Sequence, residues 1–410
     1  MRKIWNDKKY LVMTDQAVFS GNSFVATILI ARLFGPEDFG VYAAILLFIF
    51  LVMSVLTSII IQPLQVTMAR VENKHAYLSF SFWLQLALLT IVILGVAVTL
   101  TLDLAVFVPY QNLIVGIVIL MSGYIMHDFF RKLFLASAKI KSVLTIDSLS
   151  AVSQLTILLT AWFWKTPSFD QFIIILGLGY TPSILFSMFL LKPNFEQITL
   201  WKKFGLTHYR QSRWLLLTAL VQWWSANLFV VASGIVLGIK ALGAFRLVQS
   251  LFGVLNMLLQ TFENYALPQA SIKLAQSEDM ARMYLKEIST KSAIAFGSVL
   301  LIVFIFAQPI IVLAGGQNYA DFAFVVQGMS VLYFVIFMGY PIRLAIRALL
   351  LNSNFFIGYL FSLAFSLLAF KFFLETWGLL GAIGGLITSQ LILISYWQFI
   401  LIKHNFRLWK

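Results

Sequence analysis

Long apolar runs recur from one end of this chain to the other, and they restrict its fold more than any other feature. Each run has 18 or more residues with few charges, which is enough to cross roughly 30 Å of hydrocarbon as an α-helix. The strands of a membrane barrel would be about ten residues long with alternating polarity, a pattern that the sequence lacks. Only 11% of the 410 residues are charged, whereas soluble domains average about 25%.

We therefore predict an all-α polytopic membrane protein with about twelve transmembrane helices. Connections between the runs are short, and none leaves room for a separate soluble domain. The expected spans are residues 14–34, 40–66, 80–101, 109–130, 143–164, 169–191, 214–237, 244–267, 291–314, 321–342, 354–372 and 377–402.

The lysines and arginines are divided unequally between the two sides that these spans define. Of the 29, 24 fall on the side of the N-terminus and five on the other. Such a bias places the basic side in the cytoplasm, so both termini are expected there. The net charge of +13 is then a result of topology, and we expect no binding to nucleic acid. The chain has no cysteine, which excludes disulfides and thiol chemistry.

Two similar segments follow the first and the seventh expected helices. Residues 33–42 read LFGPEDFGVY and residues 236–245 read VLGIKALGAF, with glycine third and eighth in both. Because six helices return the chain to its starting side, the two halves have parallel orientation. We predict two six-helix lobes, a parallel pseudo-repeat around a central cavity. Their bounds are 1–191 and 214–410, with a cytoplasmic linker at 192–213.

Polar side chains gather on one face of the eighth expected helix. At 100° per residue, the polar residues of FRLVQSLFGVLNMLLQTFEN (245–264) share one sector, and leucines and phenylalanines occupy the other. The first, second and seventh helices also carry polar sectors, so we expect the first two helices of each half to line a wet central space. Polar residues also join helices inside membranes, and that alternative stays open. The candidate cavity residues are Arg246, Gln249, Asn256, Gln260, Asn264, Gln16, Asn22 and Gln222.

Each charged residue near the spans has two interpretations. An ionised group at mid-bilayer costs on the order of 3 kcal/mol, so it faces a cavity, a partner or the interface. Arg246 lies near the outer end of its helix, while Glu263 and Asp15 lie near inner ends. Arg343 and Arg347, one helical turn apart, either serve topology alone or bind an anionic head group, because guanidinium binds phosphate oxygens in pairs.

A second group of charges lies at the inner ends of the fourth and fifth helices. We interpret His127 and Asp128, beside Arg131 and Lys132, as a local ion-pair cluster, and Asp147 in the same way. The four histidines form no HExxH or triad-like arrangement, and no phosphate-binding Gly-Lys loop is present. We therefore expect no catalysis, no cofactor and no metal.

The segment TDQAVFSGNSFVATILIARLFGPEDFGVY, residues 14–42, resembles the first-helix region of bacterial polysaccharide-export flippases. These flippases belong to the multidrug/oligosaccharidyl-lipid/polysaccharide exporter superfamily. The most specific part is ARLFGPEDFGVY (31–42), and GLLGA (378–382) is weakly similar. The related peptidoglycan-precursor flippases have fourteen helices and an Arg-Asp pair where this chain has Ala26 and Thr27, which argues against that substrate.

The resemblance implies a transporter for polyprenyl-pyrophosphate-linked oligosaccharide in the bacterial cytoplasmic (inner) membrane. The glycan would move from the inner to the outer leaflet by alternating access, for cell-surface polysaccharide synthesis. Arg246, Arg343 and Arg347 are then the candidates for the pyrophosphate, and Glu263 and Asp15 for a coupling ion. Membrane lipid is an expected partner, and we consider a polysaccharide polymerase as a further one.

Two other functions remain in competition. An ion-coupled multidrug or cation antiporter of the same fold would require a predominantly acidic cavity, whereas the expected cavity mixes arginine with neutral amides. A membrane glycan polymerase or ligase would carry a sizeable external loop with catalytic Arg or His, and the expected outer loops are all short.

Overall fold

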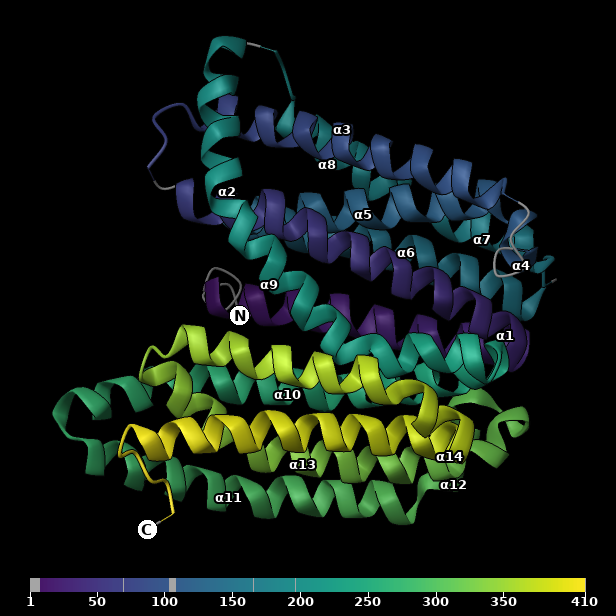
Figure 1. Ribbon diagram of the computed structural model, residues 1–410. Helices are drawn as coiled ribbons and strands as arrows, with labels where there is room; N and C mark the ends of the chain where they lie inside the picture. The colour runs from purple at the N-terminus through teal and green to yellow at the C-terminus, as the bar shows by residue number, and fades with distance from the viewer. Residues whose placement is uncertain (1–7, 69, 103–107, 165, 196, 410) are drawn as a thin grey trace. The chain divides into compact units, whose positions relative to one another are not determined.

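The computed structural model describes residues 8–68, 70–102, 108–164, 166–195 and 197–409, without the side chains of residues 8, 9, 108, 109 and 264. Within these ranges the chain is helical and contains no strand, which confirms the predicted fold class (Figure 1). A π-helix, Thr57–Ile61, and two 3₁₀-helices, Ile198–Leu200 and Gln317–Phe322, interrupt the α-helices. The α-helices are α1 (Lys8–Leu56), α2 (Gln62–Thr67), α3 (Lys74–Leu100), α4 (Val108–Gln111), α5 (Ile114–Ala136), α6 (Ile140–Phe163), α7 (Phe169–Leu178), α8 (Thr181–Leu191), α9 (Trp201–Val236), α10 (Ile239–Gln276), α11 (Glu278–Ile305), α12 (Ala307–Gly315), α13 (Ala323–Ala348) and α14 (Asn352–Lys403).

Two of the long helices are broken at a glycine. The break in α1 is at Gly35 (φ 71°, ψ −177°) and that in α14 is at Gly378 (φ 54°, ψ −133°). Glycine adopts such positive φ angles without the steric penalty that other residues pay. The described residues form ten helical stretches long and apolar enough to cross a membrane. Since each break divides one stretch into two segments of spanning length, the ten stretches agree with the twelve predicted spans.

Three helices extend beyond their predicted bounds on the basic side. We predicted a start at residue 214 for α9, an end at 267 for α10 and a start at 291 for α11, and all three are longer. Hydropathy detects only the part of a helix that lies in hydrocarbon, so these polar extensions were missed. Ser277 separates α10 from α11, and its side chain accepts a hydrogen bond from the Met280 amide as the N-cap of α11.

The chain divides into two compact units. Unit 1 contains residues 1–34 and 41–220, and unit 2 contains residues 35–40 and 221–410. The segment predicted as a linker, 192–213, belongs to unit 1, and the boundary falls inside the continuous helix α9. Domain bounds at 191 and 214 therefore stay a prediction, as does a central cavity.

A histidine attaches the start of α9 to unit 1. Pro63 has no amide hydrogen to bond the Ile59 carbonyl of the π-helix, and the His208 Nδ1 lies 3.0 Å from that oxygen. The His208 Nε2 lies 2.7 Å from the Tyr77 hydroxyl of α3. Because Nδ1 must donate to the carbonyl, a neutral ring has its lone pair on Nε2 and accepts the tyrosine hydrogen there. The ring thus joins three helices of the unit.

Within unit 1, α5 is the central helix and contacts α3, α6, α7 and α8. Its glycines allow the backbones to approach closely. A methyl group on Gly123 would collide with the Gly177 carbonyl of α7, and one on Gly177 would collide with the Leu120 backbone. Such small-residue contacts are typical of helix packing in membranes.

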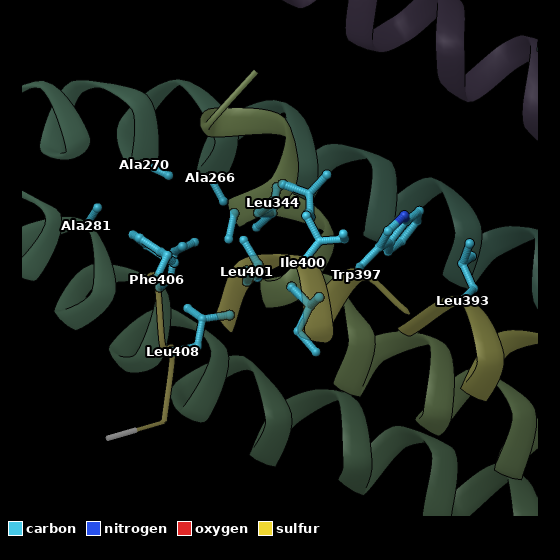
Figure 2. Close-up of a cluster of buried hydrophobic side chains, with 14 residues drawn as sticks. Ala266, Ala270, Ala281, Leu344, Leu393, Trp397, Ile400, Leu401, Phe406 and Leu408 are labelled. Carbon is cyan, nitrogen blue, oxygen red and sulfur yellow. The ribbon is translucent and has the colours of Figure 1, made fainter. Parts of the chain in front are cut away.

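Unit 2 has a corresponding central helix, α13, which contacts α10, α11 and α14. The basic ends of these helices enclose an apolar cluster that includes the tail after α14, as Figure 2 shows. Phe406 and Leu408 of the tail are 1% and 3% exposed and pack among Ala270, Ala281 and Leu344. The Arg282 guanidinium donates to the Asn405 carbonyl at 2.7 Å. The tail therefore joins the ends of α10, α11 and α13.

The repeated glycines adopt matching conformations. Gly238, before α10, has φ 95° and ψ 166°, close to the backbone of Gly35. Within unit 2, a methyl group on Gly243 would collide with the backbone of Pro36 and Gly40. Glycine is required there because the two backbone segments are in direct contact. The shared geometry supports the pseudo-repeat.

Candidate functional site

The polar face of α10 begins with a pair of half-buried side chains. The Arg246 Nη1 donates a hydrogen bond of 2.8 Å to the Gln249 Oε1 one turn later. Both residues are on the helix whose opposite face, including Phe252 and Leu255, is buried in unit 2. The amide therefore holds the guanidinium against its own helix.

Further along α10, the amide side chains lie on the face of the helix that is not packed in unit 2. Asn256 and Gln260 are both exposed, whereas Leu255 and Leu259 beside them are buried. This alternation follows the two sectors expected from the sequence. Gln222 on α9 is half-buried, and the side chain of Asn264 lies outside the described residues. A role for these residues in lining a cavity stays a prediction.

Glu263 differs from the other polar residues of α10 because it turns into unit 2. It is 7% exposed and lies on the side of the buried Leu259 and Ala266. Its carboxylate forms ion pairs with Arg347 and, at 3.5 Å, with the Arg343 Nη2. The sequence offered the two arginines as separate candidates for the pyrophosphate and Glu263 as a candidate for ion coupling. The structure joins the three residues into one site, which we call the Glu263 site.

The Glu263 site has an excess of positive charge. Two guanidinium groups face one carboxylate, and the arginine side chains remain 31% and 38% exposed. The Arg343 guanidinium also lies over the rings of Tyr340 and Phe355, at 5.5 and 5.9 Å from their centroids. The rings fix one side of the group and leave the exposed side able to bind an anion.

Unit 1 holds a buried charged cluster that the sequence did not reveal as one site. The Arg131 Nη2 donates to the Asp15 Oδ2 at 2.8 Å, and its Nε donates to the Asp147 Oδ2 at 2.6 Å. The His127 Nε2 lies 3.3 Å from the Asp147 Oδ1. The four residues come from α1, α5 and α6 and are 2–9% exposed. We call them the Arg131 cluster.

The interpretation of these residues as a local ion-pair cluster is correct only for Asp128 and Lys132, whose side chains pair at 2.7 Å within α5. His127 and Arg131 instead contact carboxylates of other helices. Two signals in the sequence were present but weak. His127 and Arg131 are one turn apart on α5, and Asp147 interrupts an apolar helix.

The candidates on α1 are engaged with this region. The Gln16 Oε1 lies 3.4 Å from the Arg131 Nη2, and its amide donates to the Ser20 hydroxyl at 2.8 Å. The Asn22 Nδ2 donates to the Gln154 Oε1 of α6 at 2.9 Å. Asn22 and Gln16 are both half-buried, so they hold α1 to its neighbours as well as facing outward.

Solved structures share this fold across nearly the whole chain. An inward-facing multidrug resistance MATE family transporter of the MOP superfamily matches with a TM-score of 0.71 and 12% identity, over 95% of this chain and 94% of that one. The lipid II flippase MurJ, in an inward closed conformation, matches with a TM-score of 0.69 and 12% identity, over 96% and 87%. A MOP superfamily transporter from Pyrococcus furiosus, described as having a binding pocket of reverse polarity, matches with a TM-score of 0.61 and 11% identity, over 97% of this chain and 96% of that one.

At these identities the structures establish the fold alone, that of multi-pass membrane transporters. No curated protein is significantly similar in sequence. A family profile described as polysaccharide biosynthesis protein matches residues 29–324, which is well over half of the chain. This segment includes most of α1, with its Gly35 break, and the whole of α10. The chain belongs to the polysaccharide biosynthesis protein family.

Proposed function

We propose that this protein is a flippase for polyprenyl-pyrophosphate-linked oligosaccharide in the bacterial cytoplasmic membrane. It carries the glycan from the inner to the outer leaflet for cell-surface polysaccharide synthesis. Membership of a polysaccharide biosynthesis family supports this proposal. So does the fold shared with a lipid II flippase. Both termini are cytoplasmic in this proposal, since the basic residues gather on their side.

The observation that carries the proposal is the Glu263 site. A pyrophosphate presents oxygens that guanidinium groups bind in pairs, and Arg343 and Arg347 lie one turn apart with part of each side chain exposed. The carboxylate of Glu263 occupies them in this structure. An arriving pyrophosphate would replace it and bring additional negative charge to a site that has one positive charge in excess.

The sugars need a different surface. A glycan in hydrocarbon would lose the hydrogen bonds of its hydroxyls to water. The exposed amides of Asn256 and Gln260, together with Gln249, replace that water without requiring one particular sugar. The isoprenoid chain stays in the lipid. The candidates for ion coupling that come from the sequence are Glu263 and Asp15, and a polysaccharide polymerase is a proposed partner.

The second candidate function is cation antiport, which the MATE-like fold favours. An organic cation would be repelled by the two arginines of the Glu263 site. The two functions therefore make opposite predictions for the charge of the transported molecule.

The test uses purified protein in liposomes that contain a polyprenyl-pyrophosphate oligosaccharide, with a membrane-impermeant lectin to report sugar in the outer leaflet. The double variant Arg343→Ala, Arg347→Ala should slow flipping by roughly tenfold or more, since a charged hydrogen bond contributes about 1.5–3 kcal/mol. Lys291→Ala is the control, because its pair with Glu287 is exposed. Wild-type protein that moves a cationic dye but not the glycan lipid would establish the antiporter instead.

A further inference from the structure

The carboxylates and the guanidinium of the Arg131 cluster do not balance in charge. Asp15 and Asp147 contribute two carboxylates, and Arg131 contributes one guanidinium that bridges them. Both aspartates are 2% exposed, and their Oδ1 atoms accept no hydrogen bond from the described residues. A buried net negative charge is unfavourable, so this cluster needs one more positive charge, from a neighbouring cation or from a proton on a carboxylate.

His127 is positioned to supply that charge. Its Nδ1 lies 3.0 Å from the Ser183 Oγ of α8, and the Ser183 hydroxyl donates its hydrogen to the Tyr180 carbonyl at 2.8 Å. The serine oxygen can therefore only accept from His127, which places a hydrogen on Nδ1. The other nitrogen, Nε2, lies 3.3 Å from the Asp147 Oδ1.

The charge of the imidazole follows from these two contacts. A neutral ring with its hydrogen on Nδ1 would turn the lone pair of Nε2 toward a carboxylate oxygen, which is repulsive. A ring with hydrogens on both nitrogens is attracted to Asp147 instead. With His127 protonated, the two carboxylates, the guanidinium and the imidazolium sum to zero charge.

The other groups around His127 do not change this balance. Asp128 and Lys132 neutralise each other on α5, and Lys132 also donates to the Thr57 hydroxyl of the π-helix. The ring of Tyr180, the residue before α8, lies 5.3 Å from the imidazole and carries no charge. Loss of the proton from Nε2 would therefore leave one uncompensated negative charge among α1, α5 and α6.

We propose that His127 is a proton-binding site in unit 1, and that the Arg131 cluster couples its proton to the packing of these helices. The inference rests on the proposed transport function and names the group that carries the coupling proton. An imidazole changes charge between about pH 5 and pH 8, within reach of a cellular pH gradient. When the proton leaves, Asp147 loses the attraction of His127, and the cluster must admit water or separate. Asp15 is then a positioning residue, which holds α1 through Arg131.

The first test measures protonation directly and is independent of transport. Wild-type protein labelled with ¹⁵N-histidine in nanodiscs should show two protonated nitrogens for His127 near pH 7, and the signal is assigned with His127→Gln. In Asp147→Asn the same signal should become that of a neutral ring. The exposed His404 is the internal control. A His127 that is neutral in wild-type protein, with the proton instead on Asp15, would overturn the proposal.

The second test uses the glycan flipping assay with a pH gradient across the liposome. Wild-type flipping should accelerate several-fold when the gradient is imposed, whereas His127→Gln, which keeps a donor toward Ser183, should flip without responding. His127→Arg, with a permanent charge, should also fold and fail to respond. The proton site at His127 would be refuted if either variant kept the full acceleration by the pH gradient, or if flipping by wild-type protein responded only to a sodium gradient.

The two failures are distinguishable. If wild-type protein does not flip the glycan lipid at all, the proposed function fails, and the nitrogen signals still decide the protonation of His127. If flipping occurs but is insensitive to His127, the function stands and this inference fails.

Discussion

Removal of the Arg131 guanidinium should destabilise unit 1 strongly. In Arg131→Met, Asp15 and Asp147 lose their shared partner while their side chains stay buried, 3% and 0% exposed. Breaking a buried ion pair from one side costs about 3–5 kcal/mol, because the remaining charge is uncompensated. The guanidinium also lies 4.2 Å from the centre of the Phe19 ring, and this contact would be lost as well. We therefore expect the upper part of that range.

The assay is equilibrium unfolding in a fixed detergent, followed by tryptophan fluorescence. The control is Lys291→Met, which removes the ion pair of Lys291 and Glu287, whose side chains are 75% and 64% exposed. It should lower the free energy of unfolding by less than about 1 kcal/mol. Adding Asp15→Asn and Asp147→Asn to Arg131→Met should recover most of the loss, because neutral groups of similar size replace a buried ionic cluster at little cost.

Two results would refute this reasoning. One is an Arg131→Met variant as stable as Lys291→Met, which would mean that water or lipid head groups reach the carboxylates. The other is a combined variant that is less stable than Arg131→Met alone, which would mean that the aspartates stabilise unit 1 through contacts other than the ion pairs.

Three further predictions concern unit 2. Gly243→Ala should lower the free energy of unfolding by about 1–3 kcal/mol through its collision with backbone, whereas Gly253→Ala, with open space around it, should be neutral or stabilising; equal thermal shifts would contradict the close approach. Phe406→Ala should lower the free energy of unfolding by about 3–5 kcal/mol, and Trp409→Ala, at a half-exposed side chain, by much less. Similar losses for the two variants would show that the tail is not packed. Glu263→Gln should increase the affinity of the arginine pair for inorganic pyrophosphate by roughly tenfold in calorimetry, which corresponds to about 1.4 kcal/mol, and an unchanged affinity would remove the carboxylate from the anion site.

The polar and apolar sectors of α10 show how much of the exposure along a helix can be predicted from the helical periodicity of its sequence. The exposed Asn256 and Gln260 and the buried Leu255 and Leu259 follow the sectors drawn from the sequence. Glu263 lies at the edge of the polar sector, and periodicity alone cannot decide which way such a residue turns. The arginines of α13 decide it, since they provide the charges that a buried carboxylate needs.

The two central helices carry related chemistry. In unit 1, α5 presents Arg131 to two carboxylates, and in unit 2, α13 presents Arg343 and Arg347 to one. The sequence shows basic residues at these helix ends, and their bias toward one side predicts the cytoplasmic side. Their carboxylate partners lie on other helices, and no local pattern reveals them.

The sequence by itself determined the membrane class, the helical fold, the twelve spans and the recurrence of glycines after the first helix of each half. These properties depend on hydropathy and backbone conformation, which are local along the chain. The tertiary structure alone decided that Arg131 bridges Asp15 and Asp147, the first of them 116 residues away, and that Glu263 faces two arginines. The physical reason is that a buried charge is stable only beside its complement, and helix packing determines which complement is near.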